Sequence, residues 1–209
     1  MSWLTRIRVE VREGLSAGLK DGYSWHQALW HCFPGKDGQR RDFLSRVDER
    51  DGTFEALMLS PDKPGTLSWG NWETKEVKPS FLEHRRYRFA LRANPTVKRV
   101  VRSASGERIK NGRRTRICGP DELLDWLRRK GEAAGFVLEQ AQAGPPVDQH
   151  SHKPGRNGSR GQRITHARVD FDGVLAVEDF GAFVKAYATG IGPAKAFGFG
   201  LLLLKPLAD

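Results

Sequence analysis

The order of the predicted strands and helices indicates an α+β protein built from two tandem ferredoxin-like domains, each a β-sheet covered by helices. Three observations predict this fold class. Apolar residues alternate in short segments, as in half-buried strands, and three other segments have helical spacing. The order strand–helix–strand–strand then occurs twice along the 209 residues. The second occurrence begins after residue 83, so we expect domains at 1–83 and 84–209.

The first half is predicted to contain four strands and one helix. The strands are expected at 3–11, as two segments within 43–60, and at 72–79. Asp51-Gly52 divides 43–60 and is a strong signal for a hairpin turn. Either Asp21 or Ser24 can cap the helix that follows the first strand, and Pro34-Gly35 ends it.

The second half is predicted to repeat this pattern with two helices. Its strands are expected at 84–93, 136–140, 163–171, 174–177 and 198–206, and its helices near 120–134 and 178–188. Asp172-Gly173 is interpreted as a second hairpin turn. The last helix is expected to bury Phe180, Phe183, Val184 and Tyr187. Residues 96–119 and 141–162 are rich in Gly, Ser and polar residues and are expected to be loops.

The positive charge of the chain is concentrated in one segment. The formal net charge is +10, yet residues 85–130 alone contain fifteen Lys/Arg and four Asp/Glu. Such an excess indicates an anionic partner, most often a phosphate backbone. A solvated arginine-rich surface is the alternative. The candidate RNA-binding residues in this segment are Arg113, Arg114 and Arg116.

A second basic cluster lies in the low-complexity segment and just after it. It consists of Lys153, Arg156, Arg160 and Arg163. The planar guanidinium group suits recognition of phosphates and of guanine edges. A hairpin that carries these residues could enter an RNA groove that a loop or a helix end has opened. The alternative is a surface loop without a role.

Tyr23 and His26 are the candidate catalytic residues. They are three residues apart on the predicted helix, so they share a face. Histidine exchanges protons near neutral pH. RNA carries its own nucleophile, the 2′-hydroxyl, and His26 could deprotonate it or protonate the leaving oxygen, while Tyr23 could orient the phosphate. An ordinary histidine on an amphipathic helix is the alternative interpretation.

A glycine-rich loop precedes the last strand. Gly190, Gly192, Gly198 and Gly200 could allow backbone N–H groups to approach an anion, with Lys195 as a nearby point charge. A dinucleotide-binding loop is disfavoured, because these glycines follow a helix and precede a strand. The alternative is a tight turn that needs a flexible backbone.

Several classes of function are disfavoured. No cluster of acidic residues or Cys/His ligands predicts a metal site, so we expect a metal-independent protein without a cofactor. No apolar run approaches the ~18 residues of a membrane span, and the N-terminus lacks the apolar region of a signal peptide. Two cysteines are too few for a disulfide framework. We therefore expect a cytoplasmic protein.

The sequence resembles a known family in its C-terminal segment GIGPAKAFGFGLLLLKP, in Tyr23-x-x-His26, in LRANPTVKR at 91–99 and in PDELLDWLRRKGEAAGF at 120–136. It is similar to the CRISPR repeat-processing ribonucleases of the type I-E branch, known as CasE. The resemblance runs from the first strand to the last residue. Its most specific element is the glycine-rich loop.

The resemblance implies a fold and an activity. Members have two RRM-like domains, bind the stem-loop of CRISPR repeat RNA and cut at its 3′ base without a metal. The 2′-hydroxyl attacks and gives a 5′-hydroxyl end and a 2′,3′-cyclic phosphate, and the enzyme stays bound in the Cascade complex with other subunits. The catalytic roles correspond to His26 and Tyr23. Two alternatives remain: a non-catalytic RRM-like RNA-binding module and a DNA-binding protein.

This sequence departs from RRM proteins in one respect. It lacks their aromatic signature for stacking bases on the sheet. We therefore expect RNA to bind in the cleft between the domains rather than on the sheet.

Overall fold

The strands of the first half form one antiparallel sheet. The computed structural model describes residues 2–36, 39, 42–98, 101–102, 105, 108–110, 114–155 and 161–208. The first sheet consists of β1 (Ser2–Glu10), β2 (Leu44–Arg50), β3 (Thr53–Ser60) and β4 (Asn71–Val77). Their order across the sheet is β2-β3-β1-β4, so the first strand lies between the third and the fourth. This is the strand order of a ferredoxin-like half.

Helices cover one face of this sheet. The expected helix is α2 (Gly22–Trp30), and a short helix that the sequence did not predict, α1 (Val11–Ser16), precedes it. Trp25 and Leu29, one helical turn apart, pack against Ile7 and Val9 of β1 and form the core of the first half. Residues 61–70 contain no helix, so this half has no second crossover helix.

The hairpin between β2 and β3 is confirmed. Arg50 pairs with Thr53, which leaves only Asp51 and Gly52 in the turn. Both residues have positive φ angles, 48° and 72°. Two left-handed residues give the turn a twist that matches the flanking strands.

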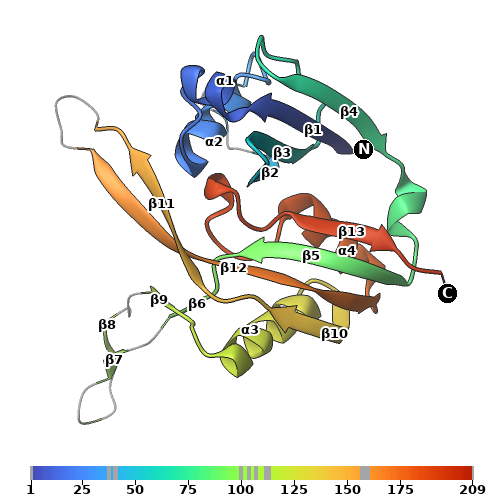
Figure 1. The fold of residues 1–209 in the computed structure, drawn as a ribbon. Coiled ribbons are helices and arrows are strands. Elements are labelled where there is room, and N and C mark those ends of the chain that lie inside the picture. Colours follow the sequence, from blue (N-terminus) through green and yellow to red (C-terminus); the bar gives the residue numbers. More distant parts are fainter. Residues whose placement is uncertain are drawn as a thin grey trace.

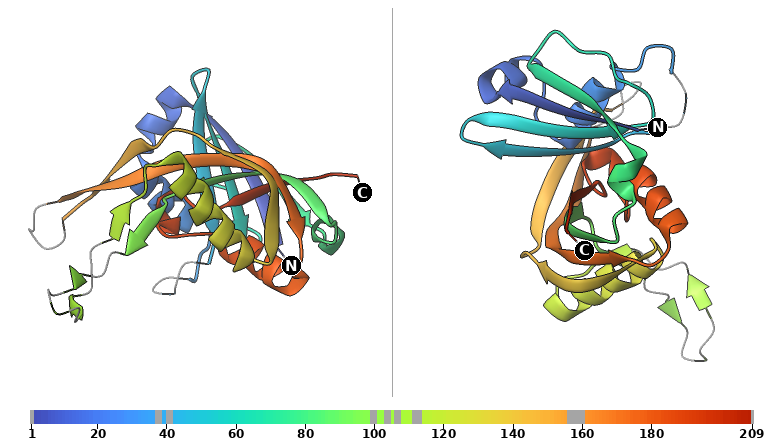
Figure 2. Two further views of the ribbon diagram at one scale, coloured as in Figure 1. Left: turned by 90° about the horizontal axis from the view of Figure 1, so that it is seen from below. Right: turned by 90° about the vertical axis from the view of Figure 1, so that its right-hand side faces the viewer.

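The second half repeats the strand order of the first. Four strands of its sheet are β5 (Arg86–Ala93), β10 (Phe136–Ala143), β12 (Gln162–Val177) and β13 (Leu202–Pro206), in the order β10-β12-β5-β13. A fifth, β11 (Val147–Lys153), pairs with β12. Two helices, α3 (Pro120–Glu132) and α4 (Phe180–Thr189), cover one face, as Figures 1 and 2 show. Phe89 of β5, Trp126 of α3 and Phe183 of α4 belong to one buried cluster. The predicted fold class, two ferredoxin-like units in tandem, is confirmed.

The predicted hairpin at Asp172-Gly173 is wrong, because β12 runs straight through these residues. Gly173 instead allows a close approach of β10: a Cβ atom there would lie 2.0 Å from the carbonyl oxygen of Gln140. The register of β10 against β12 shifts between Leu138 and Gln140, next to this point. An Asp-Gly pair is a turn signal only where the chain reverses, and here the glycine accommodates a bulge in the neighbouring strand.

Both segments expected to be loops contain strands. The low-complexity segment forms β11 (Val147–Lys153), which pairs with residues 162–168 of β12. The two strands form a ribbon, the β11–β12 ribbon, that extends beyond the sheet toward α2 (Figure 1). The basic segment contains β6 (Thr96–Lys98), β7 (Val101–Arg102), β8 (Arg108–Lys110) and β9 (Arg114–Arg116), paired β6 with β9 and β7 with β8. These short strands project away from the body of the protein (Figure 2).

The prediction for α4 is half right. Phe183 and Tyr187 are buried, whereas Phe180 and Val184 are 40% and 43% exposed. Positions 183 and 187 form a stripe that faces the sheet, and positions 180 and 184 form a parallel stripe that faces outward. The sequence alone does not distinguish these two stripes, because both are apolar.

The two halves are joined by an apolar cluster and by ion pairs. Leu44 and Leu59 of the first sheet pack with Tyr187 of α4 and with Leu201, just before β13. The connection along the chain is the short 3₁₀ helix η1 (Pro79–Leu82). The division into domains at 1–83 and 84–209 stays a prediction.

Candidate active site

The N-terminus of α2 is fixed by a capping box. Asp21 has extended backbone angles, and its Oδ1 accepts hydrogen bonds from the N–H groups of Tyr23 and Ser24, each 2.9 Å. Ser24 Oγ in turn accepts from the N–H of Asp21, also at 2.9 Å. The sequence offered Asp21 or Ser24 as the cap. The structure uses both, and their mutual bonds hold the first turn, which carries Tyr23.

Tyr23 lies where the two halves of the protein meet, and His26 lies one turn further along α2. Both side chains are half-buried. The ring of His26 lies 6.1 Å from Trp30 and 5.6 Å from Phe43, both in the first half. The ring of Tyr23 lies 6.5 Å from Phe197 of the second half, in η2 (Lys195–Phe197). Aromatic contacts from both halves therefore orient the two predicted catalytic side chains.

Three elements come into close contact at this position: α2, the glycine-rich loop and the β11–β12 ribbon. A Cβ atom on Gly22 would lie 2.9 Å from the carbonyl oxygen of Phe197 and 3.3 Å from Nε2 of Gln149. Gln149 Nε2 donates to that same oxygen at 3.0 Å. The N–H of His152 donates to Asp21 Oδ2 at 2.6 Å. Only glycine at position 22 gives the backbone room for this approach.

The glycine-rich loop is built from left-handed residues. Gly190, Gly192, Gly198 and Gly200 have φ angles between 77° and 90°. Within the loop, the N–H of Gly190 donates to Ala186, and the N–H of Gly200 donates to the carbonyl of Arg92. Because these two N–H groups are already used in the fold, the tight-turn interpretation is favoured for Gly190 and Gly200.

Lys195 does not extend into open solvent. It is half-buried, and its Nζ donates to the carbonyl oxygen of Thr189 at 2.6 Å. Thr189 is the last residue of α4, where carbonyl groups lack helical partners and the helix dipole favours a positive charge. Lys195 thus closes the loop onto the end of this helix.

Seven basic residues are predicted to bind RNA in the basic segment and the ribbon, and the four that the structure describes are all exposed. Lys153 and Arg163 are exposed near the far end of the β11–β12 ribbon, and Arg114 is exposed on β9. Arg116 is exposed too, and its Nη1 pairs with Asp148 of the ribbon at 2.9 Å. Arg113, Arg156 and Arg160 lie outside the described residues.

A buried ion network behind this site ties the two sheets together. Arg92 of β5 is only 3% exposed. Its guanidinium donates to Asp170 at 2.8 Å, to the carbonyl oxygen of Val47 at 2.8 Å and to Asp48 at 2.5 Å. Val47 and Asp48 belong to β2, so one side chain of the second half holds the first half.

The network perturbs both of its carboxyl groups. Burial by itself raises the pKa of Asp48, but hydrogen bonds and charge attraction from Arg46 and Arg92 outweigh it and lower the pKa below its ordinary value. Asp170 behaves in the same way, with Arg92 and Arg168 as its partners. Both carboxylates therefore favour the charged state in the folded protein.

His166 is a further residue at this junction. It lies on β12, and its ring packs 4.5 Å from Phe197 and 5.6 Å from Phe199. Burial lowers its pKa, and its buried Nδ1 has no hydrogen-bond partner among the described residues. A neutral His166 therefore supports the aromatic ring that contacts Tyr23.

Two cavities flank the N-terminus of α2. One, of about 310 Å³, lies between α2, β2 and the ribbon and includes Asp48, Gln149 and Phe197 in its lining. The other, of about 610 Å³, includes Tyr23 and His152. Tyr23 thus lines a space that is open to a ligand.

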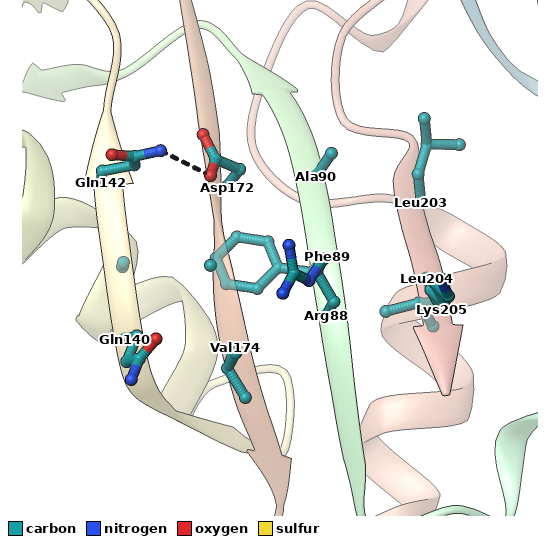
Figure 3. Close-up of a pocket in the computed structure, with 12 residues that line it drawn as sticks. Arg88, Phe89, Ala90, Gln140, Gln142, Asp172, Val174, Leu203, Leu204 and Lys205 are labelled. Carbon is teal, nitrogen blue, oxygen red and sulfur yellow. Dashed lines mark hydrogen bonds between the residues drawn. The ribbon is translucent and has the colours of Figure 1, made fainter. Parts of the chain in front are cut away.

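The open face of the second sheet holds a separate groove of about 550 Å³. Polar side chains rise into it from four neighbouring strands, as Figure 3 shows for Arg88, Gln140, Gln142, Asp172 and Lys205. Gln142 is hydrogen-bonded to Asp172 at 2.8 Å. The one aromatic residue of its lining, Phe89, is 2% exposed and belongs to the core on the other face. The groove thus presents no ring for stacking bases.

A family model described as "CRISPR associated protein" matches residues 2–206. The chain belongs to this family. The CRISPR system Cascade subunit CasE of Escherichia coli (strain K12) is 33% identical over 198 residues, which cover 91% of this CRISPR-associated protein and 95% of the relative. The CRISPR-associated endoribonuclease Cse3 of Thermus thermophilus is 32% identical, with 98% and 100% covered. The resemblance to the type I-E branch is confirmed.

A solved structure has the same fold. It is Thermus thermophilus Cse3 bound to an RNA representing a pre-cleavage complex, with a TM-score of 0.70 and 25% identity over 98% of this CRISPR-associated protein and 99% of that chain. Within the described ranges of our structure, no group of three or more His, Cys, Asp or Glu side chains has a metal-binding arrangement. No helix in these ranges is long and apolar enough to span a membrane.

Sequence reasoning found the helix of this CRISPR-associated protein that carries Tyr23 and His26 but missed the residues that hold it. Asp21 is expected from the sequence only as a helix cap, and no pattern singles out Gln149 or His166. Arg92 belongs to the polar face of its strand in the sequence pattern. Only Gly22, a glycine in the first turn of a helix, gives a local sign of close packing.

Proposed function

We propose that this protein binds the stem-loop of CRISPR repeat RNA and cuts it at its 3′ base without a metal. The observation that carries the proposal is the position of Tyr23, with His26 one turn further along the helix, where α2 meets both the ribbon and the glycine-rich loop. The relatives support it, because one is named as an endoribonuclease and the same protein is solved with a pre-cleavage RNA. Residues 1–83 would then form the domain with the catalytic helix, and 84–209 the domain with most RNA contacts.

The reaction is an internal transfer at phosphorus. The 2′-oxygen forms a bond to the phosphorus, and the bond from phosphorus to the 5′-oxygen breaks. One proton leaves the 2′-hydroxyl and one joins the 5′-oxygen, so the products are a 2′,3′-cyclic phosphate and a 5′-hydroxyl end. His26 transfers one or both protons, and Tyr23 orients the phosphate. Alignment of the 2′-oxygen with the departing oxygen supplies the remaining acceleration.

RNA binding is assigned to exposed basic residues of the ribbon and of β9. Lys153 and Arg163 near the ribbon end and Arg114 on β9 are exposed and can contact phosphates. The glycine-rich loop contributes by supporting Tyr23 through Phe197. The mature guide RNA stays bound, and the protein acts in the cytoplasm as a subunit of a Cascade complex. The name of the Escherichia coli relative, a Cascade subunit, supports the assembly.

The test uses purified protein and the repeat RNA of the adjoining CRISPR array in EDTA. We expect one specific cut by the wild type and by His84→Ala, which changes an exposed histidine in the segment between the sheets. His26→Ala should bind RNA nearly as tightly but cut on the order of 10²–10⁴ times more slowly. Tight binding without any cutting by the wild type would favour the non-catalytic RNA-binding module.

A further inference from the structure

Asp21 uses its two carboxylate oxygens for two different elements. Oδ1 accepts from the N–H groups of Tyr23 and Ser24 inside α2. Oδ2 accepts from the N–H of His152 in β11 at 2.6 Å, across 131 residues of sequence. A short bond to a charged acceptor is stronger than an ordinary amide hydrogen bond. The capping residue of the Tyr23 helix is therefore also an anchor for the ribbon.

The geometry of β11 explains why this bond forms. β11 pairs with β12 on one side only, so it is an edge strand among the described residues. Alternate N–H groups of such a strand point away from the ladder and lack a partner. The outward N–H of His152 finds Asp21 there. Lys153 follows His152 in sequence, and Arg163 on β12 is the register partner of His152. The bond therefore lies directly beside two predicted RNA-binding residues.

Other contacts hold the same junction together. Gly22 allows α2 to lie against the carbonyl oxygen of Phe197, which Gln149 of β11 also contacts. Tyr23 lies against the ring of Phe197. A displacement of the ribbon would therefore move the first turn of α2 and the Tyr23 side chain with it.

We propose that Asp21 is a positioning residue that couples RNA contact on the β11–β12 ribbon to the alignment of Tyr23 and His26. RNA that holds Lys153 and Arg163 also holds the His152 N–H against Asp21, and Asp21 then fixes the first turn of α2. The inference rests on the proposed function. It adds that the catalytic helix is held in its working position through the RNA-binding ribbon.

The substitution Asp21→Asn separates the two roles of the carboxylate. The amide oxygen of Asn can still accept from the N–H groups of Tyr23 and Ser24, but the amide nitrogen cannot accept from His152. Ser24→Ala is the converse variant, because it weakens the capping box and leaves the Asp21–His152 bond. Asp179→Asn is the matched control, since Asp179 caps α4 through the N–H of Ala182 in the same way.

The first measurement compares binding with single-turnover cutting of repeat RNA. We expect Asp21→Asn to cut on the order of 10- to 100-fold more slowly, as a small misplacement of reacting groups does, with a dissociation constant for RNA close to that of the wild type. Asp179→Asn should cut at close to the wild-type rate. Ser24→Ala keeps both bonds from Asp21 Oδ1 to the helix and should be slowed much less than Asp21→Asn. Wild-type cutting by Asp21→Asn would overturn the inference, and so would equal slowing by Ser24→Ala, because the loss would then come from the cap.

The second measurement does not depend on cutting. Amide hydrogen exchange should slow at Tyr23–His26 when RNA binds the wild type but not when it binds Asp21→Asn. Equal slowing in both proteins would overturn the coupling. If the wild type binds RNA and does not cut, the proposed function fails, and the exchange result alone then decides whether Asp21 couples the ribbon to the helix.

Discussion

Arg92 is the side chain whose removal should weaken the junction between the two halves most. It is buried, it donates to Asp48 and to the carbonyl of Val47 in the first half, and it donates to Asp170 in the second. Arg92→Met keeps a long apolar stem of similar reach but removes the charge and every one of these donors. The carbonyl oxygen of Val47 then loses this donor, and two carboxylates lose their buried partner.

The loss of unfolding free energy depends on the ion-pair partners that Asp48 and Asp170 keep after the substitution. Removing one partner from a buried ion pair costs about 3–5 kcal/mol of unfolding free energy. Here Asp48 keeps Arg46 at 2.8 Å and Asp170 keeps Arg168 at 2.6 Å, so neither carboxylate is left alone. Their side chains are also 21% and 39% exposed, and water can reach them. We therefore expect a loss near the lower limit, about 3 kcal/mol.

The assay is thermal and urea unfolding of Arg92→Met beside Arg88→Met. Arg88 lies four residues earlier on the same face of β5 and is exposed, so its replacement should change the unfolding free energy by less than about 0.5 kcal/mol. For a chain of this length, 3 kcal/mol corresponds to a fall in Tm of about 6–12 °C. A loss for Arg92→Met as small as that for Arg88→Met would refute the reasoning that this arginine joins the halves.

Two further predictions concern acid and salt. Asp48 and Asp170 have lowered pKa values in the folded state, so the unfolded chain binds more protons below about pH 4. Their stabilisation of the fold is therefore complete above that pH and is lost as pH falls through the folded pKa values. Urea unfolding from pH 7 to pH 3 checks this, and Asp48→Asn should reduce the acid sensitivity. Replacing Arg113, Arg114 and Arg116 together by Gln should weaken RNA binding and flatten the slope of log Kd against log salt by about 2, as measured by filter binding, whereas an unchanged slope would remove this segment from the RNA interface.

Local signals in the sequence predicted the local structure well. The capping of α2 depends on Asp21 and Ser24, which are three residues apart, and the β2–β3 turn depends on Asp51-Gly52 alone. Where no neighbouring strand overrides them, interactions at this range are set by local backbone geometry. The positions of the Tyr23–His26 helix and of the first hairpin could therefore be read from the residues themselves.

Long-range contacts account for what the sequence did not predict. Asp172-Gly173 is the same dipeptide as in the first hairpin, but in β12 it lies between two paired strands and cannot turn. Arg92 shares a face with the exposed Arg88, and it is buried only because β2 covers that end of the sheet. The bond between Asp21 and His152 joins residues 131 positions apart. No pattern along the chain carries information on such pairs.

The most direct test of the central claim, that RNA is cut by its own 2′-hydroxyl, uses a single deoxy sugar. Wild-type protein in EDTA is given repeat RNA with one 2′-deoxy nucleotide on the 5′ side of the cut. We predict that this RNA binds as tightly as the unmodified one and stays intact, while the unmodified RNA yields a 2′,3′-cyclic phosphate. Cutting of the deoxy RNA at the same position and rate would contradict the account, because the nucleophile would then come from elsewhere.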